Sequence, residues 1–176
     1  MSLKHAILGL LSVRPMSGYD LKKVIDESVG HFWTADQSQI YRTLSGLVDD
    51  GLADRQTIVQ EDRPNLHLHS ATNDGLSELD RWLASPLQIQ PSREPFLARL
   101  FFADRMATTK IRELLDSRRQ EIADQLAALR AITVPVEPTT IAETLRLATL
   151  ANGIRHAQAE LDWLAETAHQ LDQAAT

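Results

Sequence analysis

Apolar residues recur at helical spacing near the start of the chain and predict two consecutive helices. The first covers residues 3–13 and ends at Arg14, because the residue before a proline avoids the helical region. The second runs from Gly18 to about residue 27. Ser17 can cap its N-terminus, and Asp20 stands at the position that completes a capping box.

The segment 32–52 predicts a third helix with two different sides. Gly51 stands where a glycine commonly ends a helix. The apolar side consists of Ile40, Leu44, Leu47 and Val48. The first turns carry uncharged hydrogen-bonding groups and one cation, namely Gln37, Ser38, Gln39, Tyr41 and Arg42. Because such side chains suit base edges and phosphates, these five residues are candidates for DNA contact.

After Gly51 the spacing changes from helical to alternating. Residues 52–59 and 66–72 each predict a strand, and the polar residues between them predict the turn of a hairpin. A fourth helix is predicted at 73–83. Three helices followed by a two-stranded hairpin is the order of elements in a winged helix-turn-helix, whose recognition helix enters the major groove of DNA. The same order also fits a small α+β core that binds no nucleic acid.

Three prolines between residues 86 and 95 predict a linker, and everything beyond it is predicted to be helical. We therefore expect an α+β winged helix-turn-helix domain with a two-stranded wing at 1–85. The linker at 86–95 would lead to an all-α dimerisation domain at 96–176, which we expect to hold an effector site as well. The fold class of the whole chain is mainly α.

The last predicted helix, from about 138 to 173, carries an apolar seam with heptad spacing. Its members alternate three and four residues apart: Ile154, Ala157, Leu161, Leu164, Ala168 and Leu171. A helix this long leaves little of its own chain to bury it, so the seam favours a homodimer. Packing of the seam within one chain is the alternative.

The net charge of −6 argues against a simple nucleic-acid-binding protein, which usually carries a basic excess. Residues 1–85 contain 8 basic and 12 acidic side chains, and residues 86–176 contain 10 and 12. Local placement is more favourable, because Arg42 is the one charged residue between Gln37 and Val48. DNA binding therefore has to depend on the surface of this helix rather than on overall charge.

Several functional classes lack support in the sequence. The absence of cysteine excludes disulfides, and no apolar run or leader pattern suggests a membrane span or secretion, so we expect a cytoplasmic protein. No nucleophile, zinc-protease or phosphate-loop motif indicates an enzyme. His67 and His69 would share one face of a strand, but two imidazoles alone rarely hold a metal, so we predict neither a metal nor a cofactor.

Aromatic residues are concentrated near the predicted domain junction and beyond it. Most would belong to a core. The alternative is a pocket between the two domains for an aromatic effector, with a basic side chain nearby that pairs with a carboxylate. The candidates for such a site are Arg14, Trp82, Arg99, Phe102, Arg155, His156 and Trp163.

The chain resembles the PadR family of winged helix-turn-helix transcriptional regulators over nearly its whole length. In the N-terminal half the resemblance rests on residues 8–11, 15–21, Phe32-Trp33, 38–42, Leu47, Gly51-Leu52 and Arg63-Pro64. The C-terminal half resembles the virulence-activator-type helical domain through 93–97, 100–102, 153–154 and 160–164. The resemblance implies a DNA-binding regulator, and phenolic acids as a class of effector.

The predicted wing departs from the family pattern. The family's returning wing strand usually carries two tyrosines with a basic residue nearby, whereas here it reads Leu66-His67-Leu68-His69. The wing tip holds Glu61 and Asp62, which leaves Arg63 as the candidate for a phosphate contact.

These observations lead us to expect a homodimeric transcriptional repressor. It would bind an inverted-repeat operator in double-stranded DNA and would be released by a small aromatic carboxylate. The rival interpretation is a helical protein-interaction adaptor that does not bind DNA, which the acidic net charge favours.

Overall fold

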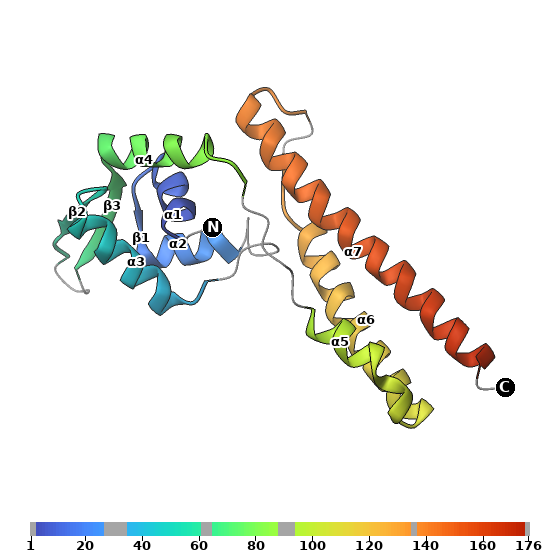
Figure 1. Cartoon of the computed structure of the whole chain (residues 1–176). Coiled ribbons are helices and arrows are strands. Elements are labelled where there is room, and N and C mark those ends of the chain that lie inside the picture. The colour runs from blue at the N-terminus through green and yellow to red at the C-terminus, as the bar shows by residue number, and fades with distance from the viewer. Residues whose placement is uncertain (1–2, 27–34, 61–64, 88–93, 135–136, 175–176) are drawn as a thin grey trace. The chain divides into compact units, whose positions relative to one another are not determined.

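The computed structural model describes residues 3–26, 35–60, 65–87, 94–134 and 137–174. The chain divides into two compact units, Met1–Gln90 and Pro91–Thr176, coloured blue to green and green to red in Figure 1. The division falls inside the linker expected at 86–95. None of the helices in the described residues combines the length and the apolar character of a membrane span.

In its described residues, the first unit contains four α-helices and a small sheet. The helices are α1 (Leu3–Leu11), α2 (Gly18–Val24), α3 (Gln37–Asp49) and α4 (Asn73–Leu83). Their apolar sides meet in one core that also includes sheet residues, and its most deeply buried members are Ile7, Leu8, Leu21, Ile25, Ile40, Leu44 and Leu47. The helical spacing therefore predicted the buried side of α3 correctly, whereas Tyr19, which the same spacing predicted to be buried in α2, is 66% exposed.

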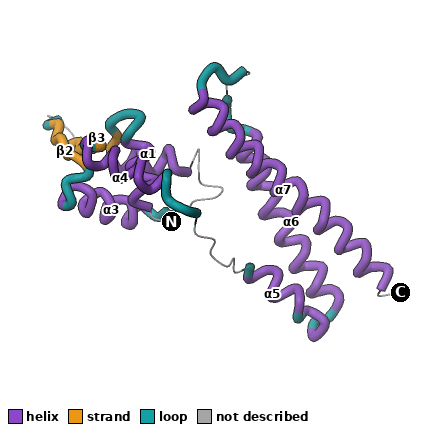
Figure 2. The backbone as a smooth tube through the Cα atoms, turned by 45° about the horizontal axis from the view of Figure 1, so that its top comes forward, coloured by secondary structure: helices purple, strands orange, loops and turns teal. Residues whose placement is uncertain are grey.

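The sheet has three antiparallel strands in the order β1-β3-β2. β2 (Ala53–Ile58) and β3 (Leu66–Ala71) form the predicted hairpin, drawn in orange in Figure 2. The sequence analysis missed β1 (Met16–Ser17), a two-residue strand that pairs Met16 with His69 of β3. A strand of two residues is too short to show an alternating pattern. The sequence instead indicated Ser17 as the N-cap of the following helix.

The helix boundaries follow from capping. Ser17 and Asp20 form the predicted capping box at the start of α2. Gly51 has a φ of +70° after α3, the left-handed conformation that a glycine adopts without strain. The predicted start of the third helix at residue 32 was wrong, because Asp36 is the extended N-cap residue and α3 begins at Gln37.

The second unit consists of helices within the described residues. It contains α5 (Pro95–Phe101), a 3-10 turn (Ala103–Arg105), α6 (Thr108–Arg130) and α7 (Ile141–Ala174). Both views show α6 and α7 side by side (Figure 2). The two helices are joined by ion pairs from Arg118 to Glu160 at 2.7 Å and from Arg112 to Asp172 at 2.5 Å. The predicted class, a mainly α protein with an α+β N-terminal domain, is confirmed.

The heptad seam of α7 packs against α6 of the same chain. Ala157 is buried in a cluster with Ile122 and Leu126, and Ile154 and Leu161 lie against that cluster. Leu164 is 1% exposed, while Ala168 and Leu171 are half-buried. The alternative that the sequence left open, packing within one chain, therefore accounts for this spacing. Contact of the same six residues with a partner stays a prediction.

Candidate nucleic-acid interface

The N-terminus of α3 is closed by a capping box in which two of the predicted DNA-binding residues take part. The Asp36 carboxylate accepts hydrogen bonds from the Ser38 hydroxyl and from the Gln39 backbone N–H, both at 2.7 Å. The Gln39 side-chain oxygen accepts the Asp36 N–H at 3.1 Å. The two bonds to the carboxylate hold the pKa of Asp36 below its ordinary value. Asp36 is therefore a persistent negative charge beside the first turn.

The cap leaves a defined set of polar atoms facing solvent. The Ser38 oxygen can still accept a hydrogen bond, and the Gln39 amide nitrogen retains two donors. Gln37, Tyr41 and Arg42 are exposed as well, whereas Ile40 and Leu44 of the same helix are buried. Arg42 makes one long contact of 3.4 Å, from Nε to the Ser38 carbonyl oxygen. The structure thus brings all five predicted residues together on the exposed N-terminal half of α3.

The wing contributes exposed polar side chains that the sequence analysis did not select. Arg55 of β2 is exposed, and the Thr57 hydroxyl and His67 Nδ1 are 3.0 Å apart across the hairpin. Strand alternation places Arg55 on the same face as the buried Ala53, so the sequence offered no signal that the Arg55 side chain would be exposed. The predicted contact Arg63 lies outside the described residues, as do Glu61 and Asp62.

His67 and His69 have different environments although they share a face of β3. β1 pairs with β3 at His69, which is 6% exposed, while His67 lies beyond the end of β1 and is exposed. Burial lowers the pKa of His69, and the nearby Arg55 lowers it further, against an opposing hydrogen bond to the Met16 backbone. No cluster of three metal-ligating side chains exists among the described residues.

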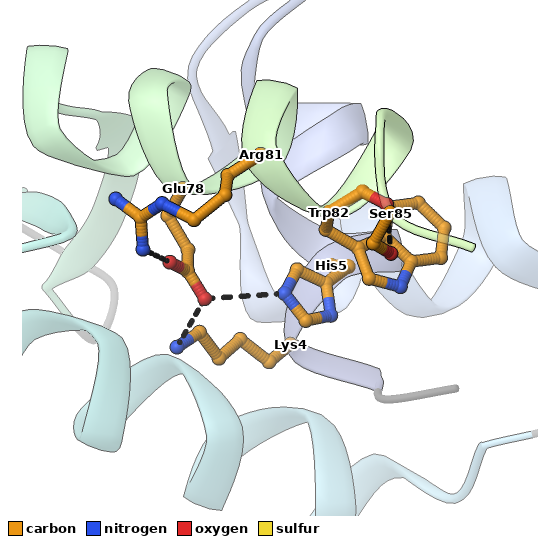
Figure 3. A network of polar contacts seen from close by, with 6 residues as sticks. All are labelled: Lys4, His5, Glu78, Arg81, Trp82 and Ser85. Atoms are coloured by element: carbon orange, nitrogen blue, oxygen red, sulfur yellow. Dashed lines mark hydrogen bonds and ion pairs between the residues drawn. The ribbon is translucent and has the colours of Figure 1, made fainter.

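The predicted effector residues of the first unit are Arg14 and Trp82. Arg14 is exposed. The Trp82 ring of α4 stacks on His5 of α1, with ring centroids 4.8 Å apart (Figure 3). Beside this stack the Glu78 carboxylate binds Lys4 at 3.1 Å, His5 at 3.3 Å and Arg81 at 2.6 Å. Trp82 therefore joins α1 to α4 and packs against the core of the first unit, which agrees with the core role predicted for most of the aromatic residues.

The predicted effector residues of the second unit are only partly grouped. Arg99 lines a cavity of about 360 Å³ between α5 and α6, together with Phe96 and Arg118. The Arg118 guanidinium lies 5.5 Å from the centre of the Phe96 ring, and Trp163 meets Phe96 edge-on at 6.2 Å.

The other three candidates lie elsewhere in this unit. Phe102 is exposed beside Phe101, and Arg155 and His156 are exposed on α7. The cavity is also lined by residues that were not among the predicted effector residues: Glu94, Pro95, Phe96, Leu114, Ser117, Arg118 and Glu121.

Comparison with known proteins identifies the family. Residues 7–81 match the family model described as "Transcriptional regulator PadR-like family", and residues 92–172 match "Virulence activator alpha C-term". A probable transcriptional regulator of Mycobacterium tuberculosis is 33% identical in an alignment 189 positions long. The alignment covers 98% of this chain and 99% of the relative. The chain belongs to the PadR-like family of transcriptional regulators.

A relative in Bacillus subtilis has been characterised structurally. The negative transcriptional regulator PadR of that organism is 30% identical over 141 residues, which span 77% of this chain and 78% of the relative. Its crystal structure in complex with operator DNA aligns with a TM-score of 0.82 and 25% identity, over 96% of this PadR-like chain and 98% of that chain.

A second crystal structure of B. subtilis PadR, in complex with p-coumaric acid, aligns with a TM-score of 0.78 and 24% identity. The alignment covers 97% of this chain and 98% of that chain. Both similarities extend over the two units, and they support the winged helix fold of a PadR-like regulator.

Proposed function

We propose that this PadR-like regulator represses transcription as a homodimer that binds an inverted-repeat operator through α3. The observation that carries the proposal is the exposed start of α3, where uncharged donors and acceptors surround the single guanidinium of Arg42. Hydrogen-bonding side chains on the first turns of a recognition helix read base edges in the major groove. B. subtilis PadR, a negative regulator solved on operator DNA, supports this assignment.

The dimer is proposed to form through the helical unit. Because the seam of α7 is covered by α6, the contact with a second copy also needs other apolar surface. The helical unit exposes large hydrophobic side chains that suit this role: Leu97, Phe101, Phe102, Met106, Ile141, Leu145 and Trp163. In a dimer, two copies of α3 would read half-sites separated by about one helical turn of DNA, roughly 34 Å.

The wing is proposed to contact the DNA backbone. Arg55 and His67 are exposed on β2 and β3. Arg63, which lies outside the described residues, is the third proposed contact. Since the first unit has few cations to contact phosphates, we expect a modest affinity for DNA and only a gentle fall of that affinity as salt rises.

The experiment that tests this function is footprinting on the DNA upstream of the protein's own gene, at low and at physiological salt. We expect two protected half-sites related by an inverted repeat and centred about 10–11 base pairs apart. Protection that does not depend on sequence would contradict operator recognition. No protection at low salt would contradict the proposal and favour a protein-interaction adaptor that does not bind DNA.

The effector is proposed to be a small aromatic carboxylate. Arg99 and Phe96 line the same cavity, where Arg99 offers a guanidinium for the carboxylate and Phe96 an apolar ring for the aromatic group. The complex of B. subtilis PadR with p-coumaric acid supports this chemical class. Such a ligand induces transcription only if it binds the DNA-free arrangement more tightly than the DNA-bound one.

Calorimetry with a panel of benzoic and cinnamic acids tests the effector. We expect binding that weakens about tenfold in Arg99→Ala, and release of DNA by the same compounds. Arg119→Ala is the control, because Arg119 is exposed on α6 and pairs only with Asp116 at 3.2 Å among the described residues. If every compound fails to bind at millimolar concentration, the aromatic-acid class is wrong.

A further inference from the structure

We propose that Gly18 is a positioning residue for Tyr41, and that its missing side chain fixes the place of the tyrosine ring on the DNA-binding surface. The part of this inference that concerns DNA rests on the proposed function. Gly18 is the first residue of α2, and Tyr41 lies in the second turn of α3. A β-carbon at Gly18 would stand 2.5 Å from Cε1 and 2.8 Å from Cζ of the Tyr41 ring. The ring therefore lies directly on the backbone of the neighbouring helix.

The backbone conformation at position 18 does not itself require a glycine. Gly51 is the glycine with a positive φ among the described residues, so Gly18 adopts an angle open to any residue. Alanine forms helices more readily than glycine, and nothing in the local geometry of α2 opposes it. What an alanine would meet is the Tyr41 ring. The small residue at 18 is thus explained by the contact between the helices.

The contact holds an otherwise mobile side chain in one place. Tyr41 is 45% exposed, and Ile40 beside it is buried in the core. Ring atoms Cδ1, Cε1 and Cζ of Tyr41 lie close to Gly18, while nearly half of the residue is exposed to solvent. A side chain that is already ordered loses less conformational entropy when it contacts a partner. Its phenolic hydroxyl can then donate a hydrogen bond to a phosphate without a change of side-chain rotamer.

The effect of a substitution at Gly18 depends on which atoms the new β-carbon would overlap. Cε1 and Cζ belong to the far end of the ring, which can swing into the solvent that already surrounds it. An added methyl group would therefore displace the Tyr41 ring and leave the packing of α2 on α3 in place. Gly18→Ala is expected to change the DNA-binding surface while the fold survives.

Ring position is measured without DNA by ¹⁹F NMR on protein labelled with 3-fluorotyrosine. The chain contains two tyrosines, so two resonances are expected, and Tyr41→Phe assigns them. Gly18→Ala should move the Tyr41 resonance toward the position of a solvent-exposed ring. Gly9→Ala is the matched control, because Gly9 also lies in a helix and a β-carbon there would meet no atom within 4 Å. An unchanged Tyr41 resonance in Gly18→Ala would overturn the proposal.

The consequence for DNA is measured by a double-mutant cycle on a selected operator duplex. We expect Gly18→Ala and Tyr41→Ala each to weaken binding about fivefold to tenfold, and the double variant to bind like Tyr41→Ala alone. Additive losses would overturn the role of Gly18 in DNA binding. If the wild-type protein binds no DNA, the proposed function fails, while the NMR result still decides whether Gly18 positions the ring.

Discussion

Gly75 in the first turn of α4 lies directly against the carbonyl oxygen of Leu52, so closely that any β-carbon at Gly75 would overlap that oxygen. The same oxygen accepts the Thr72 N–H at 3.1 Å, and the Thr72 hydroxyl donates to the Gly51 carbonyl oxygen at 2.7 Å. The Gly75 N–H in turn donates to the Thr72 hydroxyl at 3.1 Å. These contacts join the end of α3 to the start of α4, and thereby fix the wing between them.

Gly75→Ala is expected to destabilise the first unit. The clash is with backbone, which cannot rotate away as a side chain can, so the expected loss is about 1–3 kcal/mol. Thermal unfolding followed by circular dichroism measures it. Gly9→Ala, where a β-carbon has free space, should leave the melting temperature unchanged or raise it slightly. Equal stability of Gly75→Ala and the wild type would show that α4 does not approach Leu52 this closely.

Stability of the first unit is expected to fall as the pH drops below about 6.5, the ordinary pKa of histidine. Because the pKa of His69 is lowered in the folded state, the unfolded chain binds more protons in the range between the folded and unfolded values. Stability then rises with pH across that range and is fully present above it. Urea unfolding at several pH values between 5 and 8 measures the dependence.

Two substitutions separate His69 from its neighbour. His69→Gln should flatten the pH dependence in this range, whereas His67→Gln should retain it, because His67 is exposed on the same strand. A pH dependence that disappears in His67→Gln and persists in His69→Gln would show that His67, and not His69, causes it. That result would contradict the prediction.

Charges placed in the α7 seam and on the exposed apolar surface are expected to act differently. Leu164→Glu buries a carboxylate that has no partner, so it should lower the stability of the helical unit itself. Phe101→Glu acts on a side chain that is 80% exposed and should dissociate the dimer while the helix content stays unchanged. Sedimentation velocity and circular dichroism on both variants test this. A folded dimer of wild-type affinity in Phe101→Glu would remove Phe101 from the dimer contact.

The sequence predicted the elements whose signals are periodic. The spacing of Ile40, Leu44 and Leu47 predicted α3 and its buried side, and the change of spacing after Gly51 predicted the hairpin. The box formed by Ser17 and Asp20 was also predicted, because capping depends on residues only three apart. These features are set by local chemistry.

The remaining features depend on contacts between distant segments. The sequence does not show that Met16 pairs with His69, so it gave no reason to expect His69 buried and His67 exposed. The seam of α7 has the same spacing whether α6 or a second copy covers it. The contact of Gly18 with Tyr41 likewise requires knowledge of how α2 crosses α3.

The central claim is that α3 reads DNA, and the most direct measurement is a fluorescence anisotropy titration of a selected operator duplex with Arg42→Ala and Gln37→Ala. Neither side chain takes part in the Asp36 capping box, so α3 should stay intact. Arg81→Ala on α4 is the control. It removes an arginine outside α3, and Glu78 retains its contacts with Lys4 and His5. We predict that Arg42→Ala weakens binding by about 1–3 kcal/mol while the control binds like the wild type. Unchanged affinity in both Arg42→Ala and Gln37→Ala would contradict the claim.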